Sequence, residues 1–117
     1  MCDKCYILVK IFEAADSNPH SNYLPIISFI EKMIHQERLE LYAGDCPIEE
    51  VQRILMEESH YTIRHYLKCK TCNQHFLIGA CIRGTPVYRI IDKISGENID
   101  NLWGRYGIYF RKKHDQP

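Results

Sequence analysis

Two pairs of cysteines have the residue types and the spacing to bind a metal. Two residues separate Cys2 from Cys5, and two separate Cys69 from Cys72. The tight turn of a CxxC pair aims two thiolates at one point, and two pairs together supply the four sulfur ligands of a tetrahedral zinc site. Four thiolates leave no open position for water, so such a zinc would be structural rather than catalytic. We therefore predict a structural zinc site formed by Cys2, Cys5, Cys69 and Cys72.

The separation of the two pairs leaves other interpretations open. Sixty-three residues lie between Cys5 and Cys69, so the site forms only if the fold returns the N-terminus to the second pair. Otherwise the cysteines are unpaired thiols in a frayed terminus and in a turn. A thioredoxin-type redox pair is disfavoured, because Cys69 and Cys72 lie between two predicted strands and not at a helix N-terminus. Three other residues could substitute as ligands: Cys46, His75 and Cys81.

The spacing of apolar residues indicates which helices and strands must position these cysteines, and it changes along the chain. Apolar residues at helical spacing predict helices over residues 24–36 and 45–58, and we favour a helix over 6–15, where apolar residues lie on nearly every face. Beyond residue 60 the apolar residues alternate, which predicts strands. The predicted strands cover residues 61–68, 74–82, 87–91 and 106–111.

This order of elements predicts an α+β fold. We expect N-terminal helices packed on one face of a C-terminal antiparallel β-meander of about four strands. The whole chain, 1–117, is expected to form a single domain, with residues 1–59 mainly helical and residues 60–113 mainly β.

Composition restricts the class of protein. Hydrophobic residues make up 45% of the chain and charged residues 26%, which is typical of a globular protein. No apolar stretch approaches the roughly 20 residues of a membrane span, and the N-terminus lacks the pattern of a secretion signal. We therefore expect a soluble, cytoplasmic protein whose six cysteines are free thiols or metal ligands and not a disulfide framework.

A formal net charge of zero conceals two parts of opposite charge. Residues 1–60 carry five Lys or Arg against eleven Asp or Glu, and residues 61–117 carry ten against four. The acidic part could attract a basic partner protein, although a solvated helix face would have the same composition. The candidate partner-binding residues are Glu37, Glu40, Asp45, Glu49, Glu50, Glu57 and Glu58.

The basic part supports an alternative function. Basic residues interleaved with tyrosines on a sheet face could hold the phosphates and stack the bases of a single-stranded nucleic acid. The balanced total charge argues against a dedicated nucleic-acid-binding protein. The residues concerned are Arg64, Lys68, Lys70, Arg83, Arg89, Arg105, Arg111, Lys112 and Lys113, with Tyr66, Tyr88, Tyr106 and Tyr109.

Catalytic motifs are not apparent. The sequence has no Gly-rich phosphate loop, no nucleophile elbow and no HExxH motif, so we do not expect an enzyme.

The segment "YLKCKTCNQHFLIGACIRGTP" resembles small bacterial proteins in which a CxxC hairpin precedes a Cys-Ile-Arg-Gly-x-Pro turn, and it covers roughly a fifth of the chain. In overall character the chain is similar to the immunity proteins of polymorphic-toxin systems such as contact-dependent growth inhibition. This resemblance implies a bacterial, non-enzymatic protein that binds and neutralises a cognate toxin, often a basic nuclease, by covering its active site. The alternative from the residues themselves is a zinc-stabilised nucleic-acid-binding module.

Overall fold

The structure is a computed structural model that describes residues 2–82 and 84–114, without the side chains of residues 112–114. Helices and strands follow one another along the chain in this order: α1 (Tyr6–Ala15), α2 (Pro19–His35), β1 (Leu39–Gly44), the 3-10 helix η1 (Ile48–Glu50), α3 (Val51–Glu57), β2 (Thr62–Cys69), β3 (His75–Cys81), β4 (Val87–Ile91), α4 (Gly96–Asp100) and α5 (Ile108–His114).

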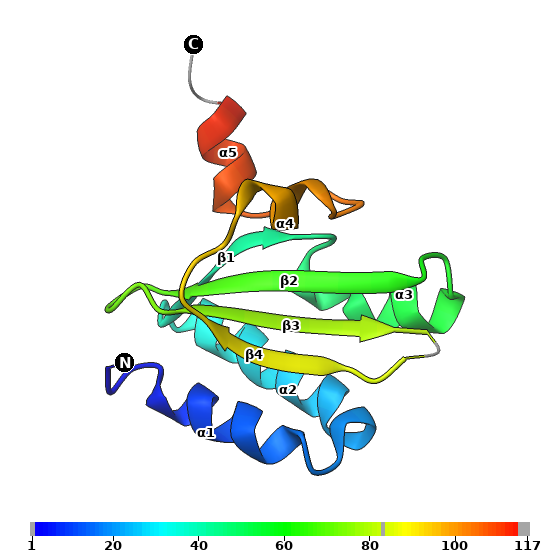
Figure 1. Ribbon diagram of the computed structural model, residues 1–117, viewed down its shortest axis with the longest axis horizontal. Coiled ribbons are helices and arrows are strands. Elements are labelled where there is room, and N and C mark those ends of the chain that lie inside the picture. The colour runs from blue at the N-terminus through cyan, green and yellow to red at the C-terminus, as the bar shows by residue number, and fades with distance from the viewer. Residues whose placement is uncertain (1, 83, 115–117) are drawn as a thin grey trace.

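The four strands form one antiparallel sheet in the order β1-β2-β3-β4. In Figure 1 the helices α1, α2 and α3 lie behind this sheet, while α4 and α5 lie beyond its β1 edge. The α+β class is therefore confirmed, as is the antiparallel meander of four strands.

Alternation along the strands explains how the helices cover the sheet. In β2 the side chains of Ile63 and Leu67 are fully buried and belong to the same cluster as those of α1, α2 and α3. Phe12 of α1 packs on this face of the sheet. Its ring centroid lies 5.8 Å from that of Phe76 and 5.6 Å from that of Tyr88, both edge to face. These aromatic contacts hold α1 along β3 and β4.

A second, smaller cluster covers the other face of the sheet near β1. Tyr66 is buried there with Ile99 of α4 and Phe110 of α5. The Ser95 hydroxyl accepts a hydrogen bond from the Asn98 N–H, which caps α4 at its N-terminus. The two C-terminal helices therefore pack on the face of the sheet that the N-terminal helices leave free.

The fourth strand is not the one that we predicted. It is β1, in the part of the chain expected to be helical, whereas residues 106–111 are mostly helical. Tyr106 makes one isolated bridge to Gly44, and Gly107 then turns the chain away with a φ of +116°. Since α4 and α5 also lie after residue 60, the predicted division into a helical part and a β part is only partly right.

The other predicted boundaries agree more closely. The helix α1 covers the predicted residues, and β2, β3 and β4 lie within one or two residues of their predicted ranges. The helix α2 begins earlier than predicted, at Pro19, and it contains Pro25. Over the described residues, no helix combines the length and the apolar character that crossing a membrane requires.

Candidate functional site

The four predicted ligands lie together. The Sγ atoms of Cys2, Cys5, Cys69 and Cys72 are all within 4.8 Å of one another. The distances are 3.6 Å from Cys2 to Cys69, 3.6 Å from Cys5 to Cys72 and 3.9 Å from Cys2 to Cys5. A tetrahedral ion with bonds of about 2.3 Å to sulfur would place its ligands about 3.8 Å apart. The cluster therefore has the dimensions of a four-cysteine metal site.

The N-terminal pair is held by the turn that starts α1. The N–H groups of Cys5 and Tyr6 both donate to the carbonyl of Cys2, at 3.3 and 3.1 Å. Cys5 is the N-cap of α1, and its side chain caps no backbone group of the helix. Its fully buried thiol is therefore free to face the cluster, at the end of the helix where the dipole favours negative charge.

The second pair is held by the turn between β2 and β3. The N–H of Asn73 donates to the carbonyl of Cys69 at 3.0 Å, and Asn73 has a left-handed backbone with a φ of 65°. Asparagine tolerates that conformation better than most residues. The N–H of Lys70 donates to the carbonyl of Arg38 at 3.1 Å, which fastens the turn to the segment before β1.

The helix α1 brings the two cysteine pairs together, although they are far apart in the sequence. Its Phe12 packs on Phe76, which follows the second cysteine pair by four residues. The beginning of α1 and the β2–β3 turn accordingly lie at the same end of the molecule, on the left of Figure 1. Packing of an apolar helix, and not any local motif, brings Cys5 to Cys72.

Electrostatics within the cluster favour a bound cation. Burial raises the pKa of Cys5 to about 12, and burial likewise raises the pKa of Cys69. Burial also acts to raise the pKa of Cys2, but hydrogen bonds from the backbone of Lys4 and Cys5 and from neighbouring thiols outweigh it and lower the pKa to about 6. Four thiolates this close repel one another, so full ionisation of the cluster needs a positive ion.

The suggested substitute ligands do not reach the cluster among the described residues. Cys46 instead lies beside the fully buried His65, whose Nε2–H donates to the carbonyl of Cys46 at 2.8 Å. Burial is the main cause that raises the pKa of Cys46 to about 12, and the negative charge of Asp45 is the next. A protonated thiol that is 1% exposed cannot act as a nucleophile on a substrate in solution.

Asp45 corrects our assignment of the partner-binding residues. It is 1% exposed and cannot contact a partner. Its Oδ1 accepts the N–H groups of Trp103 and Gly104 at 2.7 and 3.2 Å, and its Oδ2 accepts that of Arg64 at 2.7 Å. Burial raises its pKa, and these three hydrogen bonds oppose that effect. The carboxylate fastens the segment after α4 to the sheet.

The remaining six acidic candidates do not form one surface. Glu37 borders a hollow near the N-terminal turn, with Lys4 and Arg38. Glu40 lies in β1, with its carboxylate 3.9 Å from the Lys68 ammonium. The other four come together on η1 and α3, in the order Glu49, Glu50, Glu57 and Glu58.

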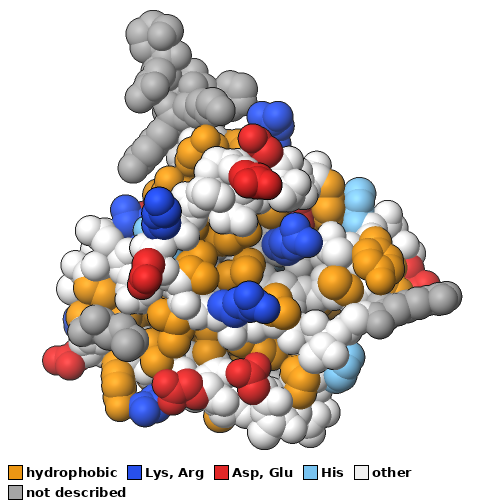
Figure 2. Space-filling model, viewed as in Figure 1, with side chains coloured by type: hydrophobic (Ala, Val, Ile, Leu, Met, Phe, Trp, Pro, Cys, Tyr) orange, Lys and Arg blue, Asp and Glu red, His pale blue; other side chains and the backbone are white. Residues whose placement is uncertain are grey.

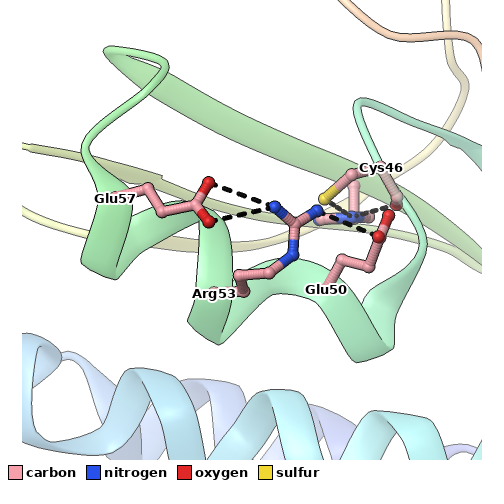
Figure 3. A network of polar contacts seen from close by, with 5 residues as sticks. Cys46, Glu50, Arg53 and Glu57 are labelled. Carbon is pink, nitrogen blue, oxygen red and sulfur yellow. Dashed lines mark hydrogen bonds and ion pairs between the residues drawn. The ribbon is translucent and has the colours of Figure 1, made fainter.

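On α3, Arg53 extends between two of these glutamates (Figure 3). Its guanidinium lies 2.9 Å from the Glu50 carboxylate and 3.1 Å from that of Glu57. Both pairs are exposed, where an ion pair contributes about 0–1 kcal/mol. Four glutamates against one arginine leave the segment from Glu49 to Glu58 acidic.

The sequence interpretation missed Met56, which is 78% exposed on the same helix. It lines a surface hollow with four polar residues, and we call this group the α3 surface: Glu49, Gln52, Arg53, Met56 and Glu57. Met56 lies outside the apolar stripe of Ile48, Val51 and Ile54, and that position is the signal that could have identified it.

The basic and aromatic residues of the alternative function are dispersed. Tyr66 and Tyr88 are buried, and the Tyr88 hydroxyl donates to the carbonyl of Pro19 at 2.7 Å beneath the helices. On the face seen in Figure 2 the basic side chains are scattered among hydrophobic and acidic ones and do not gather in one patch. Arg83 and the side chains of Lys112 and Lys113 lie outside the described residues.

Compared with protein-family models, curated proteins and solved structures, the chain has no match. Its function must therefore be argued from its own geometry.

Proposed function

We propose that this chain is a non-enzymatic protein-binding domain, fastened by one structural zinc ion, that neutralises a basic partner protein. The observation that carries the binding part is the α3 surface, where an exposed methionine lies among polar side chains that include two glutamates, Glu49 and Glu57. An apolar anchor within a charged rim is the arrangement found at protein interfaces, and negative charge selects a basic partner.

Zinc suits the cluster better than hard cations such as Mg²⁺ or Ca²⁺ do, because those prefer oxygen ligands and four thiolates in a tetrahedral arrangement suit zinc. Four protein ligands complete its coordination, so the ion has no position for a substrate or an activated water. The role that fits is to tie the N-terminus to the β2–β3 turn. At free zinc about 1,000 times the dissociation constant, such a site stabilises the fold by about 4 kcal/mol.

Elemental analysis of the purified protein tests the metal. We expect about one zinc per chain, and cobalt in its place should give the visible absorption of a tetrahedral thiolate site. Cys69→Ser should lose the metal and lower the melting temperature, and a chelator should do the same to the wild type. Cys81→Ser is the matched control, because Cys81 is partly exposed and lies outside the cluster. Metal-free protein of unchanged stability would refute the zinc proposal.

The partner that the sequence resemblance suggests is a toxin domain of a polymorphic-toxin system, and the acidic α3 surface supports a basic one. Isolation of the tagged chain from its host, with mass spectrometry of the bound protein, would identify it. Expressed alone, that partner should arrest growth, and co-expression of this chain should restore it. A partner that is harmless when expressed alone would refute neutralisation.

Two substitutions test the surface itself. Met56→Lys combined with Glu57→Lys removes the anchor and reverses an exposed charge, and it should weaken binding of the purified partner about tenfold or more. Glu97→Lys, at an exposed acidic residue of α4, is the control and should leave the affinity unchanged. Equal affinities in a calorimetric titration would show that the α3 surface is not the contact.

The nucleic-acid-binding alternative receives less support, because two of its four tyrosines are buried. Titration with single-stranded RNA at increasing salt separates the two functions, since phosphate contacts weaken steeply with salt.

A further inference from the structure

A groove of about 630 Å³ lies between α2, β1, η1 and α5. One wall is the C-terminal part of α2, the floor is β1 and the loop into η1, and the other wall is residues 105–111. Apolar side chains form most of its lining: Ile34, Leu41, Pro47, Ile48 and Phe110. A volume of this size accepts several apolar side chains at once.

The wall formed by residues 105–111 is firmly attached to the sheet. The N–H of Tyr106 donates to the carbonyl of Gly44 at 3.0 Å, and the N–H of Gly44 donates to the carbonyl of Tyr106 at 2.8 Å. Asp45 holds the backbone of Trp103 and Gly104 just before it. A Cβ atom on Gly107 would lie 2.6 Å from the carbonyl oxygen of Tyr42, so this backbone lies directly against β1. The groove is therefore preformed, which lowers the entropic cost of filling it.

The two rims of the groove carry opposite charges. Glu31 of α2 and Glu49 of η1 lie along one rim, and Arg105 and Arg111 lie along the other. The Arg105 guanidinium lies over the Phe110 ring, 5.8 Å from its centroid, which places it beside an apolar side chain of the same wall. An occupant that matches this pattern has an apolar stripe with basic residues on one side and acidic residues on the other.

We infer that the groove binds an amphipathic helix of the partner protein, with its apolar stripe on the floor, basic residues toward Glu31 and Glu49, and acidic residues toward Arg105 and Arg111. Apolar residues at positions i, i+3, i+4 and i+7 of a helix form such a stripe, and groove-binding helices use it. This inference rests on the proposed function, because it names the part of the partner that enters the groove. Glu49 lines both the groove and the α3 surface, so a partner seated on one reaches the other.

The experiment uses three labelled helical peptides of about 18 residues with the same leucine stripe. One has lysines on one side and glutamates on the other, one has lysines on both sides, and one has glutamates on both. The mixed peptide should bind the zinc-loaded chain about tenfold more tightly than either uniform peptide, as measured by fluorescence anisotropy. Methyl NMR shifts should fall on Ile34, Leu41 and Ile48.

Reversal of one rim gives the decisive comparison. Arg105→Glu combined with Arg111→Glu makes both rims acidic, and both residues are exposed, so the fold should tolerate the change. This variant should prefer the all-lysine peptide over the mixed one. An unchanged order of affinities, shifts outside the groove, or no binding of any peptide would overturn the inference. Concentration-dependent dimerisation with shifts in the groove would overturn it in favour of a second copy of the chain.

The two proposals can fail separately. Met56→Lys with Glu57→Lys should leave peptide binding unchanged, because neither residue lines the groove. Normal peptide binding with unimpaired partner binding by that variant would refute the α3 surface and leave the groove inference standing.

Discussion

His65 should make the stability of this protein depend on pH in a defined window. The ring is fully buried, its Nε2–H donates to the carbonyl of Cys46 at 2.8 Å, and its Nδ1 has no hydrogen-bond partner in the part of the chain that the structure describes. Protonation would put an unpaired charge on Nδ1 inside the core. Burial therefore lowers the pKa of His65 from 6.5 to about 4, against a weaker opposing effect of the hydrogen bond to Cys46.

The sign follows from which state takes up the proton first. As the pH falls below 6.5, the unfolded chain protonates His65 while the folded chain does not, so acid favours unfolding. The contribution is fully present above pH 6.5 and is lost progressively down to about pH 4. The whole difference corresponds to about 3 kcal/mol in the free energy of unfolding, of which about 1 kcal/mol is lost between pH 7 and pH 5.5.

Urea unfolding at these two pH values, with saturating zinc, measures the effect. His65→Gln retains a donor for the Cys46 carbonyl but cannot titrate, so it should lose about 1 kcal/mol less than the wild type over this interval. Zinc binding also weakens in acid, but equally in both proteins, and it cancels in the difference. His20→Gln, at an exposed site on α2, should behave as the wild type does. Equal losses in wild type and His65→Gln would refute the reasoning.

Two further predictions concern the attachment of the C-terminal segment. Asp45→Ala leaves three backbone N–H groups without their acceptor and should lower the free energy of unfolding by about 3 kcal/mol, with faster amide exchange at Trp103 and Gly104; native exchange rates there would contradict the assigned role. Gly104→Ala should destabilise the fold by about 3 kcal/mol in a denaturant titration, because the new Cβ would clash with the carbonyl group of Asp45. Gly96→Ala meets nothing within 4 Å and is the control, so equal stability of the two alanine variants would refute the close approach.

The sequence identified the strands of the meander well, because β2 and β3 each bury alternate residues against helices. It failed at β1, where a bulge between Leu41 and Ala43 breaks the alternation, so that Leu39 and Leu41 pack in one cluster and Ala43 packs in the other. The flanking helical patterns also made this short strand look like a connection. It failed again at α5, whose aromatic residues have a high strand propensity. Packing on β1 and the turn at Gly107 decide that segment, and neither can be read from local sequence.

The metal-ligating residues were easier to predict from the sequence than the residues of a binding surface. Two CxxC pairs are recognisable as metal ligands from residue type and spacing alone. The site could therefore be predicted, although only the fold brings Cys5 to Cys72. An acidic residue carries no such signal. Asp45 and Glu49 are four residues apart, yet one holds buried backbone groups and the other is exposed on the α3 surface. The difference is that the carboxylate of Asp45 accepts the N–H of Trp103, which is 58 residues away in the chain. A local sequence pattern does not reveal such a contact.

The cysteine cluster is separate from the two surfaces proposed to bind a partner. The cysteine cluster lies at the end of the sheet where the N-terminus meets the β2–β3 turn, whereas α3 lies near the opposite end (Figure 1). The walls of the groove depend on Asp45 and on the pairing of Gly44 with Tyr106, none of which touches the cysteines. A metal at one end can therefore fasten the chain without lying in the contact. Loss of zinc should lower the fraction of folded protein that is available to a partner, while the affinity of the folded molecules and their preference among partners stay the same.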